Sequence, residues 1–546
     1  MKLRALIHEH AAALACAAAF FAQGYVFIRR VGVQHDESLF AGALLRPLEV
    51  WTSVEVFGRR VPLGPDAYLG CLKAWLYAPL LKLWRPSVFS LRVPVLLAGA
   101  VTIWLLFRLM RRWAGPGAAA AACALLATES VFVLTTVLDW GPVALQHLLT
   151  VLALWLLWRF HETGRLWRLA LGSLVCGLAL WDKATFLWML AGLAVGAAVA
   201  FRRELGRLLT ARNLAVGVCG LLVGASPLIY SSLTSPERLQ RASGGLSTEH
   251  YLAKAAILAR TLDGSGLFGY LTRLEAPPAP QAPETRVEKI ALAVSRGLGR
   301  PDSHYQFWAA AVALLLLPLL WKSPARRLMV FGLAAFLVAW LSMAATARGG
   351  MSVHHIVLLW PLPQILTGAA ASQIPRLLPR RGRLLAVVLI GVVCLSGLAV
   401  TNHYLVQFIE RGTPVAWTDA SYPLWERLNT MRIRDLYALD WGIVGPVRWL
   451  GGGRLPLRGW IPMEPGWQER QWAAFRNVVS EPDNCYIAHT ADSEFFPGQR
   501  QALSRFAAQE GLREEILSVI GDRHGRPVFE LFRYAPAGTE REAGPR

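Results

Sequence analysis

Residues 166–200 read LWRLALGSLVCGLALWDKATFLWMLAGLAVGAAVA, two apolar runs separated by the short charged turn Trp181-Asp182-Lys183. A helix needs about 20 apolar residues to cross the hydrocarbon core of a membrane, and each run approaches that length. The first run is the shorter one and ends at this turn. This indicates that the chain turns back directly into the second run. The stretch therefore predicts two neighbouring membrane helices whose connecting turn carries an acid and a lysine.

The same pattern recurs along the chain, which has 546 residues, 54% of them apolar and only 17% charged. Its mean hydropathy of +0.39 is too high for a soluble protein of this size. We predict a polytopic α-helical membrane protein with about 11 transmembrane helices. The predicted spans are residues 10–28, 91–109, 116–137, 142–160, 166–181, 185–201, 213–231, 305–321, 328–346, 353–373 and 384–401. No A-x-A-type cleavage site follows the first span, which argues against a cleaved signal peptide.

Lysine and arginine are distributed unevenly among the short loops between these spans. The chain holds 56 of them against 36 acidic residues, a net charge of +20. Every second loop carries three or four of these cations, and the loops between carry one or none. Since cytoplasmic loops are enriched in lysine and arginine, we predict an inner-membrane protein with a cytoplasmic N-terminus. Residues 30–90, 232–303 and everything after 402 then lie outside, and no nucleic acid partner is expected.

The chain divides into a predicted transmembrane domain, residues 1–402, and a periplasmic or extracellular domain, residues 403–546. The second region holds 18 of the 36 acidic residues, and its short β-type and helical runs alternate, which predicts a small α/β domain. The β-type runs begin at Leu436, Cys485, Ile516 and Val528, and the helical runs are Tyr422–Met431, Gln468–Val479 and Gln499–Gln509. The outer loop 30–90 contains two amphipathic stretches, near 36–57 and 68–84, and the second suits a helix lying in the interface plane.

Several charged residues lie at the predicted outer ends of the spans, where a charge next to the membrane needs a reason. Taken singly they have ordinary explanations, because Asp139 or Asp182 can cap the next helix and a histidine pair can lie at the interface. Together, five non-adjacent segments bring acids, cations and histidines to one depth of the membrane, which favours an outward-facing active site. The set comprises Asp36, Glu37, Asp139, Asp182, Lys183, Arg348, His354 and His355.

This set of side chains suits the transfer of a group from a lipid phosphate to an acceptor hydroxyl or amine. A carboxylate at a lipid interface can act as a general base, and cations at the same depth can hold a phosphate. The sequence has no Walker A motif, no G-x-G-x-x-G after a strand, no H-E-x-x-H and no G-x-S-x-G. Water-soluble nucleotide donors are not expected outside the cell membrane, so a lipid-linked donor is the consistent choice.

Several short motifs follow one another in an order that fits this topology. They are Asp36-Glu37, Pro62-Leu63-Gly64-Pro65-Asp66-Ala67-Tyr68, Leu72-Lys73-Ala74-Trp75-Leu76, Ser90-Leu91-Arg92-Val93-Pro94, Leu138-Asp139 and Gly177-Leu-Ala-Leu-Trp-Asp-Lys183. Over residues 1–230 the chain resembles the integral-membrane glycosyltransferases of the GT-C fold. The resemblance is to the dolichyl-phosphate-mannose protein mannosyltransferase-like family that includes the aminoarabinose transferases of lipid A. That family usually has Lys or His before its Pro-Pro-Leu-type motif, where this chain has Arg59 or Arg60.

The resemblance implies a membrane glycosyltransferase that moves a hexosyl or pentosyl group from a polyprenyl-phosphate donor to an extracytoplasmic acceptor, with inversion. It implies that Asp36 is the catalytic base or orients the acceptor, that Glu37 helps to hold the acceptor and that Asp139 is a supporting carboxylate. Cations aimed at the leaving phosphate would stabilise its developing charge. The residues expected to contact the donor phosphate are Lys183, Arg60, Arg348, His354 and His355.

Several alternatives stay open at this level. A divalent metal could be held by Asp36, Glu37, Asp139 and His355, although their spacing is no metal signature. The scaffold could carry an oligosaccharyl- or phosphoglycerol-type transferase. A transporter or flippase would place ionisable groups near the bilayer midplane, whereas here they lie at span ends on one side. The sequence does not specify the sugar, nor whether the acceptor is a protein, a lipid or a glycan.

Overall fold

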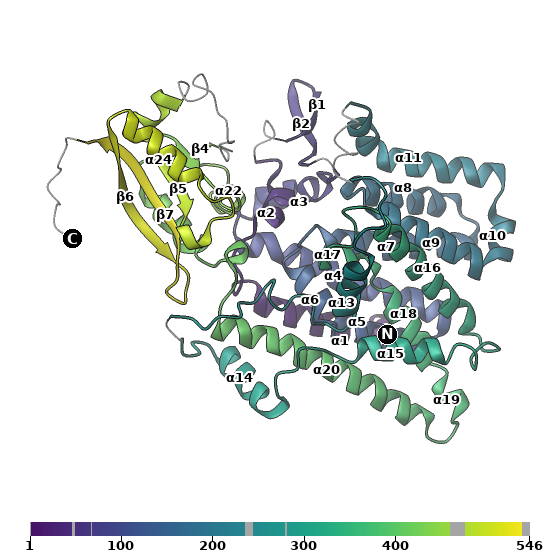
Figure 1. The fold of residues 1–546 in the computed structure, drawn as a ribbon. Helices are drawn as coiled ribbons and strands as arrows, with labels where there is room; N and C mark the ends of the chain where they lie inside the picture. Colours follow the sequence, from purple (N-terminus) through teal and green to yellow (C-terminus); the bar gives the residue numbers. More distant parts are fainter. Residues whose placement is uncertain are drawn as a thin grey trace.

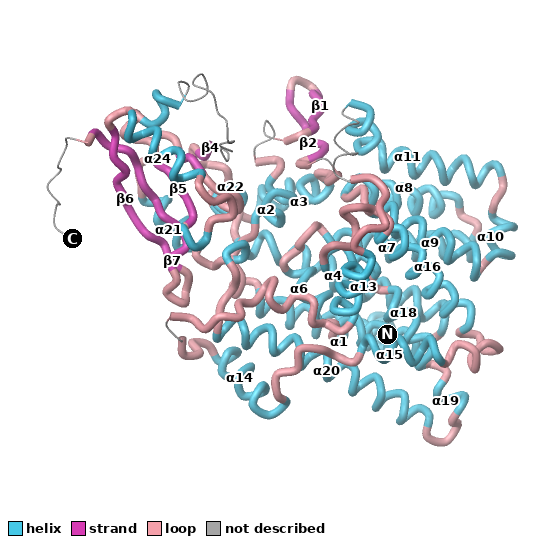
Figure 2. The backbone as a smooth tube through the Cα atoms, in the orientation of Figure 1, coloured by secondary structure: helices cyan, strands magenta, loops and turns pink. Residues whose placement is uncertain are grey.

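A computed structural model describes residues 2–45, 50–66, 68–234, 244–278, 281–458 and 475–537, with side chains from His10 onward. It consists of a helical body and a smaller sheet domain formed by the C-terminal part of the chain (Figure 1). Figure 2 shows strands in two places, a hairpin at one end of the helical body and the C-terminal sheet. The predicted helical membrane protein with a small C-terminal α/β domain is confirmed.

The helical body contains long apolar helices. Among the described residues, six are long and apolar enough to cross a membrane, or eight spans if each of two bent pairs counts as one. The six are α1 (Lys2–Phe27), α4 (Val88–Ala114), α7 (Val143–Thr163), α11 (Ala211–Thr234), α16 (Arg326–Ala344) and α20 (Gly382–Glu410). The bent pairs are α5 (Pro116–Ala127) with α6 (Ser130–Val137), at 61°, and α9 (Phe186–Ala200) with α10 (Arg202–Leu208), at 103°.

The predicted count of eleven spans is not confirmed, because three of the predicted spans consist of helices shorter than the 18 residues required of a membrane span. These are α8 (Leu166–Asp182), α15 (Gln306–Leu315), and α17 (Val353–Ile356) with the 3-10 turn Val357–Leu359 and α18 (Leu362–Ala371). Proline has no backbone N–H and restricts the residue before it, so it ends or interrupts a helix. Pro361 stands between the 3-10 turn and α18, and Pro318 lies in the turns that follow α15.

Small residues let neighbouring helices approach closely. A Cβ on Gly177 of α8 would lie 2.2 Å from the Leu221 carbonyl oxygen of α11, so these two backbones are in contact. A Cβ on Gly192 of α9 would lie 2.4 Å from the Ala335 carbonyl oxygen of α16. Close backbone approach at small residues is a common way for membrane helices to pack. It produces two tight helix pairs, α8 with α11 and α9 with α16, on the same side of the helical body (Figure 1).

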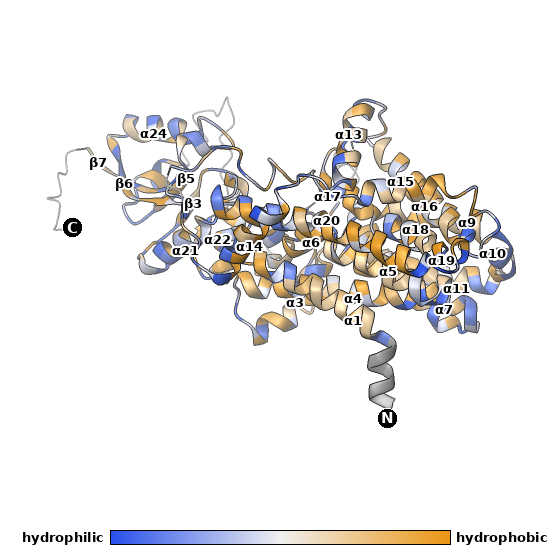
Figure 3. Cartoon of the chain, turned by 90° about the horizontal axis from the view of Figure 1, so that it is seen from below, coloured by the Kyte–Doolittle hydropathy of each residue, from blue (hydrophilic) through white to orange (hydrophobic). Residues whose placement is uncertain are grey.

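The outer surface of the helical body is apolar, whereas the C-terminal domain is more hydrophilic (Figure 3). On α20, Leu384 and Val387 are each 69% exposed, and on α11 Val223 is 64% exposed. Exposed side chains of this kind on long apolar helices suit contact with lipid tails.

The first predicted outer segment, residues 30–90, contains a short helix, a hairpin and a longer helix among its described residues. These are α2 (His35–Gly42), the antiparallel strands β1 (Thr52–Val56) and β2 (Arg59–Gly64), and α3 (Leu72–Leu83). The amphipathic helix predicted near 68–84 is present as α3. The stretch predicted near 36–57 is divided between α2 and β1, because Val54, Glu55 and Val56 alternate with the period of two that favours a strand.

In the second predicted outer segment, residues 232–303, the described part includes the helices α13 (Tyr251–Leu262) and α14 (Arg286–Leu298). Lys254 of α13 is buried, and its ammonium donates to the carbonyl oxygens of Ala344 (2.7 Å) and Thr346 (2.8 Å) at the end of α16. Glu288 of α14 forms an ion pair with Arg30, just after α1. These contacts attach the segment to the helical body.

The C-terminal domain is a five-stranded sheet in the order β4-β3-β5-β7-β6. Its strands are β3 (Leu436–Ala438), β4 (Leu457–Arg458), β5 (Cys485–His489), β6 (Leu512–Gly521) and β7 (Pro527–Pro536), and its helices are α21 (Ser421–Thr430), α22 (Val444–Leu450) and α24 (Gln499–Gln509). β3 is parallel to β4 and β5, and β7 is antiparallel to β5 and β6. The predicted strands and two of the three predicted helices are therefore present; most of the third, Gln468–Val479, lies outside the described residues.

The two domains meet at α2. A Cβ on Gly445 of α22 would lie 2.5 Å from the Ser38 hydroxyl and 2.9 Å from the His35 carbonyl oxygen, so α22 rests directly on α2. The predicted boundary at residue 402 falls inside α20, which continues to Glu410. The C-terminal domain is thus held against the helix that carries the predicted catalytic acids.

Candidate active site

Side chains from three separate segments meet around the Lys183 ammonium. Lys183 follows α8 and is only 1% exposed, and its ammonium donates to the Gly141 carbonyl oxygen at 2.7 Å. The carboxylates of Asp182, Asp139 and Asp36 all act electrostatically on it. Asp36 comes from α2 and Asp139 from the turn after α6. The structure therefore brings together three of the predicted site segments.

Asp36 is positioned by the first turn of α2. The Gln34 side chain caps this helix and accepts hydrogen bonds from the backbone N–H groups of Asp36 (2.6 Å) and Glu37 (3.3 Å). Glu37 accepts in return from the Gln34 backbone N–H at 2.9 Å, which completes a capping box. Asp36 is partly exposed, while Glu37 is fully buried. The cap therefore directs the two adjacent acids into different surroundings.

Glu37 is bound to Arg92 of α4. The Arg92 guanidinium pairs with the Glu37 carboxylate and also donates to the carbonyl oxygens of Ile28 (2.7 Å), Val31 (2.8 Å) and Gly32 (2.6 Å). Both side chains have no exposed area. A buried ion pair with all its hydrogen bonds made holds the local chain in place, and removing one partner is strongly destabilising. This arrangement gives Glu37 an anchoring position that differs from the acceptor contact expected for it.

Asp139 is bound to Lys73 of α3. The Lys73 ammonium lies 2.5 Å from one Asp139 oxygen, and the other accepts from the Ala144 backbone N–H at 3.0 Å. Both side chains are 1% exposed. Asp139 also has a positive φ of 43°, a conformation uncommon for a residue with a side chain. Asp139 thus caps the start of α7 and, with Lys73, forms a buried ion pair beside Lys183.

The turn that carries Lys183 is fixed to the segment before α3. The Ala184 backbone N–H donates to the Tyr68 carbonyl oxygen, and the Gly70 N–H donates to that of Asp182, both at 3.0 Å. A Cβ on Gly70 would lie 2.0 Å from the Trp181 carbonyl oxygen, so only glycine fits there. This pairing holds the Lys183 backbone rigidly.

The side chain of Asp182 is held by Gln146 of α7, whose amide donates to it at 2.8 Å. The same amide donates to the Ala179 carbonyl oxygen at 3.0 Å, which fixes its orientation. Asp182 is 1% exposed and therefore lies behind Lys183 rather than in an open space. Nothing in the sequence distinguishes Gln146 from other polar residues on a membrane helix.

The two histidines of α17 lie on another side of Lys183. A Cβ on Gly141 would lie 2.5 Å from the His354 ring and 3.1 Å from the Lys183 ammonium, so Gly141 separates the two. The His354 ring contacts the ring of Trp140 (4.4 Å between centroids) and that of His355 (4.4 Å). Trp140 in turn stacks on Tyr270 at 4.1 Å. Aromatic rings thus surround this side of the cluster.

The two predicted arginines are exposed and are less closely connected to the cluster. Arg60 is exposed on the β1–β2 hairpin, where it stands opposite Glu55. Arg348 is also exposed and lies near enough to Tyr68 to act on it electrostatically. Tyr68 feels the charges of Asp66 and Asp36 as well. Arg348 therefore borders the cluster, while no contact in the described part of the chain links Arg60 to it.

Burial shifts the pKa values of two charged groups in the cluster, Asp36 and Lys183. It raises the pKa of the Asp36 carboxyl to about 6, against the opposing effect of its hydrogen bond with Gln34. It lowers the pKa of the Lys183 ammonium to about 8, although three nearby carboxylates favour the charged form. Near neutral pH the site therefore holds a carboxylate that accepts a proton easily and a lysine that keeps its charge.

The candidate metal ligands are only partly available in the structure. Among the described residues there is no group of three or more His, Cys, Asp or Glu side chains placed to hold a metal ion. Glu37 and Asp139, two of the four candidate ligands, are each engaged by a buried cation.

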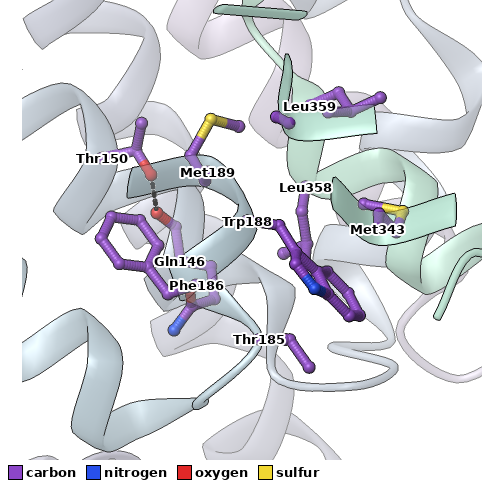
Figure 4. A pocket seen from close by; sticks show the side chains of 10 residues that line it. Gln146, Thr150, Thr185, Phe186, Trp188, Met189, Met343, Leu358 and Leu359 are labelled. Atoms are coloured by element: carbon purple, nitrogen blue, oxygen red, sulfur yellow. Dashed lines mark hydrogen bonds between the residues drawn. The ribbon is translucent and has the colours of Figure 1, made fainter. Parts of the chain in front are cut away.

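A small cavity lies next to Gln146, between α7, the start of α9, α16 and the 3-10 turn Val357–Leu359 (Figure 4). Gln146, Thr150, Phe186, Trp188 and Met189 are among the side chains that line it. Its volume of about 10 Å³ leaves room for no more than one water molecule. The bundle is thus closely packed under the charged groups.

Comparison with known proteins supports the predicted fold. The family model described as dolichyl-phosphate-mannose-protein mannosyltransferase matches residues 70–230, less than half of the chain. This range contains Lys73, Asp139 and Lys183. A comparison with curated protein sequences finds no match.

Among solved structures, the chain is similar to ArnT from Cupriavidus metallidurans bound to undecaprenyl phosphate, with a TM-score of 0.56 and 14% identity over 96% of this chain and 98% of that one. Its apo state gives a TM-score of 0.53 and 15% identity, over 93% and 96%. The apo oligosaccharyltransferase of Archaeoglobus fulgidus gives 0.47 and 12%, over 87% and 69%. The likeness to ArnT shows that the chain has the GT-C fold, as predicted.

Proposed function

We propose that the protein is a membrane glycosyltransferase that takes a sugar from a polyprenyl-phosphate donor and transfers it to an acceptor outside the cytoplasmic membrane. The observation that carries the proposal is the meeting of Asp36, Asp139 and Lys183, from three distant segments, around one buried ammonium. The GT-C fold and the match to the mannosyltransferase model support it. The known ArnT structure is bound to undecaprenyl phosphate, which agrees with a donor of this class.

In this proposal Asp36 is the general base. Its carboxylate takes the proton from the acceptor hydroxyl or amine as the acceptor atom forms a bond to the anomeric carbon. The bond from that carbon to the phosphate oxygen breaks, the electron pair leaves with the phosphate, and the configuration inverts. A base whose pKa is near the working pH is efficient in such a step, and burial places Asp36 there.

Lys183 binds the donor phosphate. Its ammonium is held by the Gly141 carbonyl oxygen and has further N–H donors for an anion. As the phosphate gains charge on leaving, its attraction to this fixed cation increases, which lowers the barrier. His354 and Arg348 border the same place and are proposed to contact the phosphate or the sugar. Glu37 fixes α2 through its ion pair with Arg92, and Asp139 fixes the Lys73 side chain.

The proposal can be tested in cells by comparing envelope glycans and lipids by mass spectrometry. Strains would carry the wild-type gene, no gene, Asp36→Asn, or the control Asp302→Asn, an outer-loop acid that is 73% exposed and pairs with His403. We expect one sugar-modified envelope component to be lost without the gene and with Asp36→Asn, and kept with Asp302→Asn. An unchanged envelope in the strain without the gene would contradict the proposal.

A further inference from the structure

A large apolar cavity lies between the two tight helix pairs, α8 with α11 and α9 with α16. Its volume is about 450 Å³, within the range of sites that bind small molecules. It exists because α8 packs far more extensively on α11 than on α9, which leaves space between the pairs. Its walls are formed by leucines and other apolar side chains, such as Leu157 of α7, Leu193 of α9 and Leu221 of α11.

The cavity is open along α11. Leu214 and Val218 both line it, and they are 58% and 44% exposed. They stand on a membrane helix whose outer face is apolar, so the opening faces the lipid side of the helical body. An occupant can therefore enter sideways from the membrane.

One end of the cavity is polar, and arginines neighbour its lining residues in the chain. His161, Glu204 and Asn213 line this end, where the short helix α10 closes it. Arg202, Arg203, Arg207 and Arg212 are exposed on α10 and at the start of α11. The charge pattern of the loops predicts that this end faces the cytoplasm. An apolar cavity with cations at its mouth is complementary to a molecule with an anionic head and an apolar tail.

The donor's own tail has no path from the active site to this cavity through the interior of the helix bundle. Between Lys183 and the large cavity, along α7 and α9, lies the water-sized cavity of Figure 4. There Phe186 and Met189 are 1% and 3% exposed, and the Thr150 hydroxyl donates to the Gln146 carbonyl oxygen at 2.7 Å. A polyprenyl chain that starts at Lys183 has no space to pass through this layer.

We propose that the cavity binds an acyl chain of an anionic phospholipid from the arginine-rich leaflet, with its phosphate headgroup on the arginines of α10 and α11. This site is separate from the transfer site and does not depend on the proposed function. The lipid fills the gap between the two helix pairs. The surrounding membrane thereby becomes part of the packing of α8 and α9, the helices joined by the Lys183 turn.

Native mass spectrometry of the purified full-length protein tests this site. The protein would be mixed with phosphatidylglycerol or with phosphatidylethanolamine of the same acyl chains. We expect one phosphatidylglycerol to stay bound preferentially. In Arg207→Gln/Arg212→Gln its affinity should fall about 30-fold, which corresponds to about 1 kcal/mol for each cation near the membrane surface. The control Arg380→Gln/Arg383→Gln removes two exposed arginines, one just before α20 and one in its first turn, and should bind as the wild type does.

A second pair of variants tests the cavity itself. Gly217 lines it, and a Cβ there would lie 3.6 Å from the Ser173 hydroxyl, an ordinary contact, so Gly217→Phe fills the space. Gly391→Phe is the control, because nothing lies within 4 Å of a Cβ at that position of α20. We expect only Gly217→Phe to lose the lipid, with both proteins monodisperse.

Three results would overturn the proposal: equal retention of the two phospholipids, equal loss of lipid in the variants and their controls, or displacement of phosphatidylglycerol by undecaprenyl phosphate. The last would assign the cavity to the donor's tail. The arginine variants alter only exposed side chains, so they give a result even if Gly217→Phe does not fold.

Discussion

Replacing Lys183 by methionine removes a buried cation on which three site carboxylates act. The side chain keeps its length and apolar stem, so the change removes mainly the charge and the hydrogen bond to the Gly141 carbonyl oxygen. If the ammonium binds the donor phosphate, both donor binding and turnover should fall. The affinity for the acceptor should change little.

The size of the effect follows from what the ammonium contacts. Loss of the hydrogen bond from the charged ammonium to the Gly141 carbonyl oxygen costs about 1.5–3 kcal/mol of folding stability. Loss of a fixed donor to a charge that develops in the transition state costs about 3–4 kcal/mol, or about 100- to 1,000-fold in rate. The rate is therefore compared per folded molecule, so that the loss of catalysis is separated from any loss of stability. Lys183→Arg should keep part of the activity, since the charge remains while the geometry changes.

A matched control is Lys254→Met. Lys254 is also a fully buried lysine, and its ammonium bonds two carbonyl oxygens, so its loss should also destabilise the protein. Purified proteins would be compared by release of sugar-free polyprenyl phosphate and by thermal unfolding. If Lys183→Met unfolds earlier but turns over as fast per folded molecule as the control, the lysine is structural and the reasoning is refuted.

The remaining predictions concern the base, pH, the anchor and the topology. Asp36→Asn should stay folded and lower turnover about 100-fold or more, the usual scale for a positioned base, and wild-type turnover in the purified variant would remove Asp36 from the mechanism. Burial raises the pKa of Asp36 to about 6 and lowers that of Lys183 to about 8. We therefore expect kcat/KM to fall below pH 6, where Asp36 is protonated, and above pH 8, where Lys183 loses its proton. In Asp36→Asn the fall below pH 6 should be absent. Glu37→Gln should destabilise the protein by about 3–5 kcal/mol, because it leaves its buried arginine partner without a counter-charge; thermal unfolding measures this, and an unchanged unfolding temperature would argue against the anchor. A cysteine at Asp492 should react with a membrane-impermeant thiol reagent in intact cells and one at Arg203 only after lysis, and the reverse pattern would overturn the orientation.

The membrane helices could be predicted because apolar runs are local signals. The charged cluster could be predicted because the cations of the loops alternate in a simple pattern. Apolar runs with charged turns mark helices such as α4 and α7, and the cation alternation places Asp36, Asp139 and Lys183 on one side. The strands of the C-terminal domain were visible as short β-branched and aromatic runs. These features depend on composition and spacing, which the sequence displays directly.

The partners of the site residues could not be predicted, because they depend on how distant segments dock. Lys73 looks like one polar residue on an interfacial helix, and only the packing of α3 against the turn after α6 buries it beside Asp139. Arg92 stands inside a motif at the start of a span, and its role appears only when α2 brings Glu37 to it. Arg60 was expected at the phosphate, but strand pairing places it on an exposed hairpin.

The central claim is that this site cleaves a polyprenyl-phosphate sugar, and the most direct measurement is the lipid product. Purified wild-type protein, Asp36→Asn and Lys183→Met would each be incubated with the total lipid and envelope extract of the host, which supplies donor and acceptor whatever the sugar is. Mass spectrometry of the lipids should show sugar-free polyprenyl phosphate accumulating with the wild type only. Release of a polyprenyl diphosphate would instead indicate an oligosaccharyl-type reaction, and equal release by all three proteins, or none by the wild type, would contradict the account.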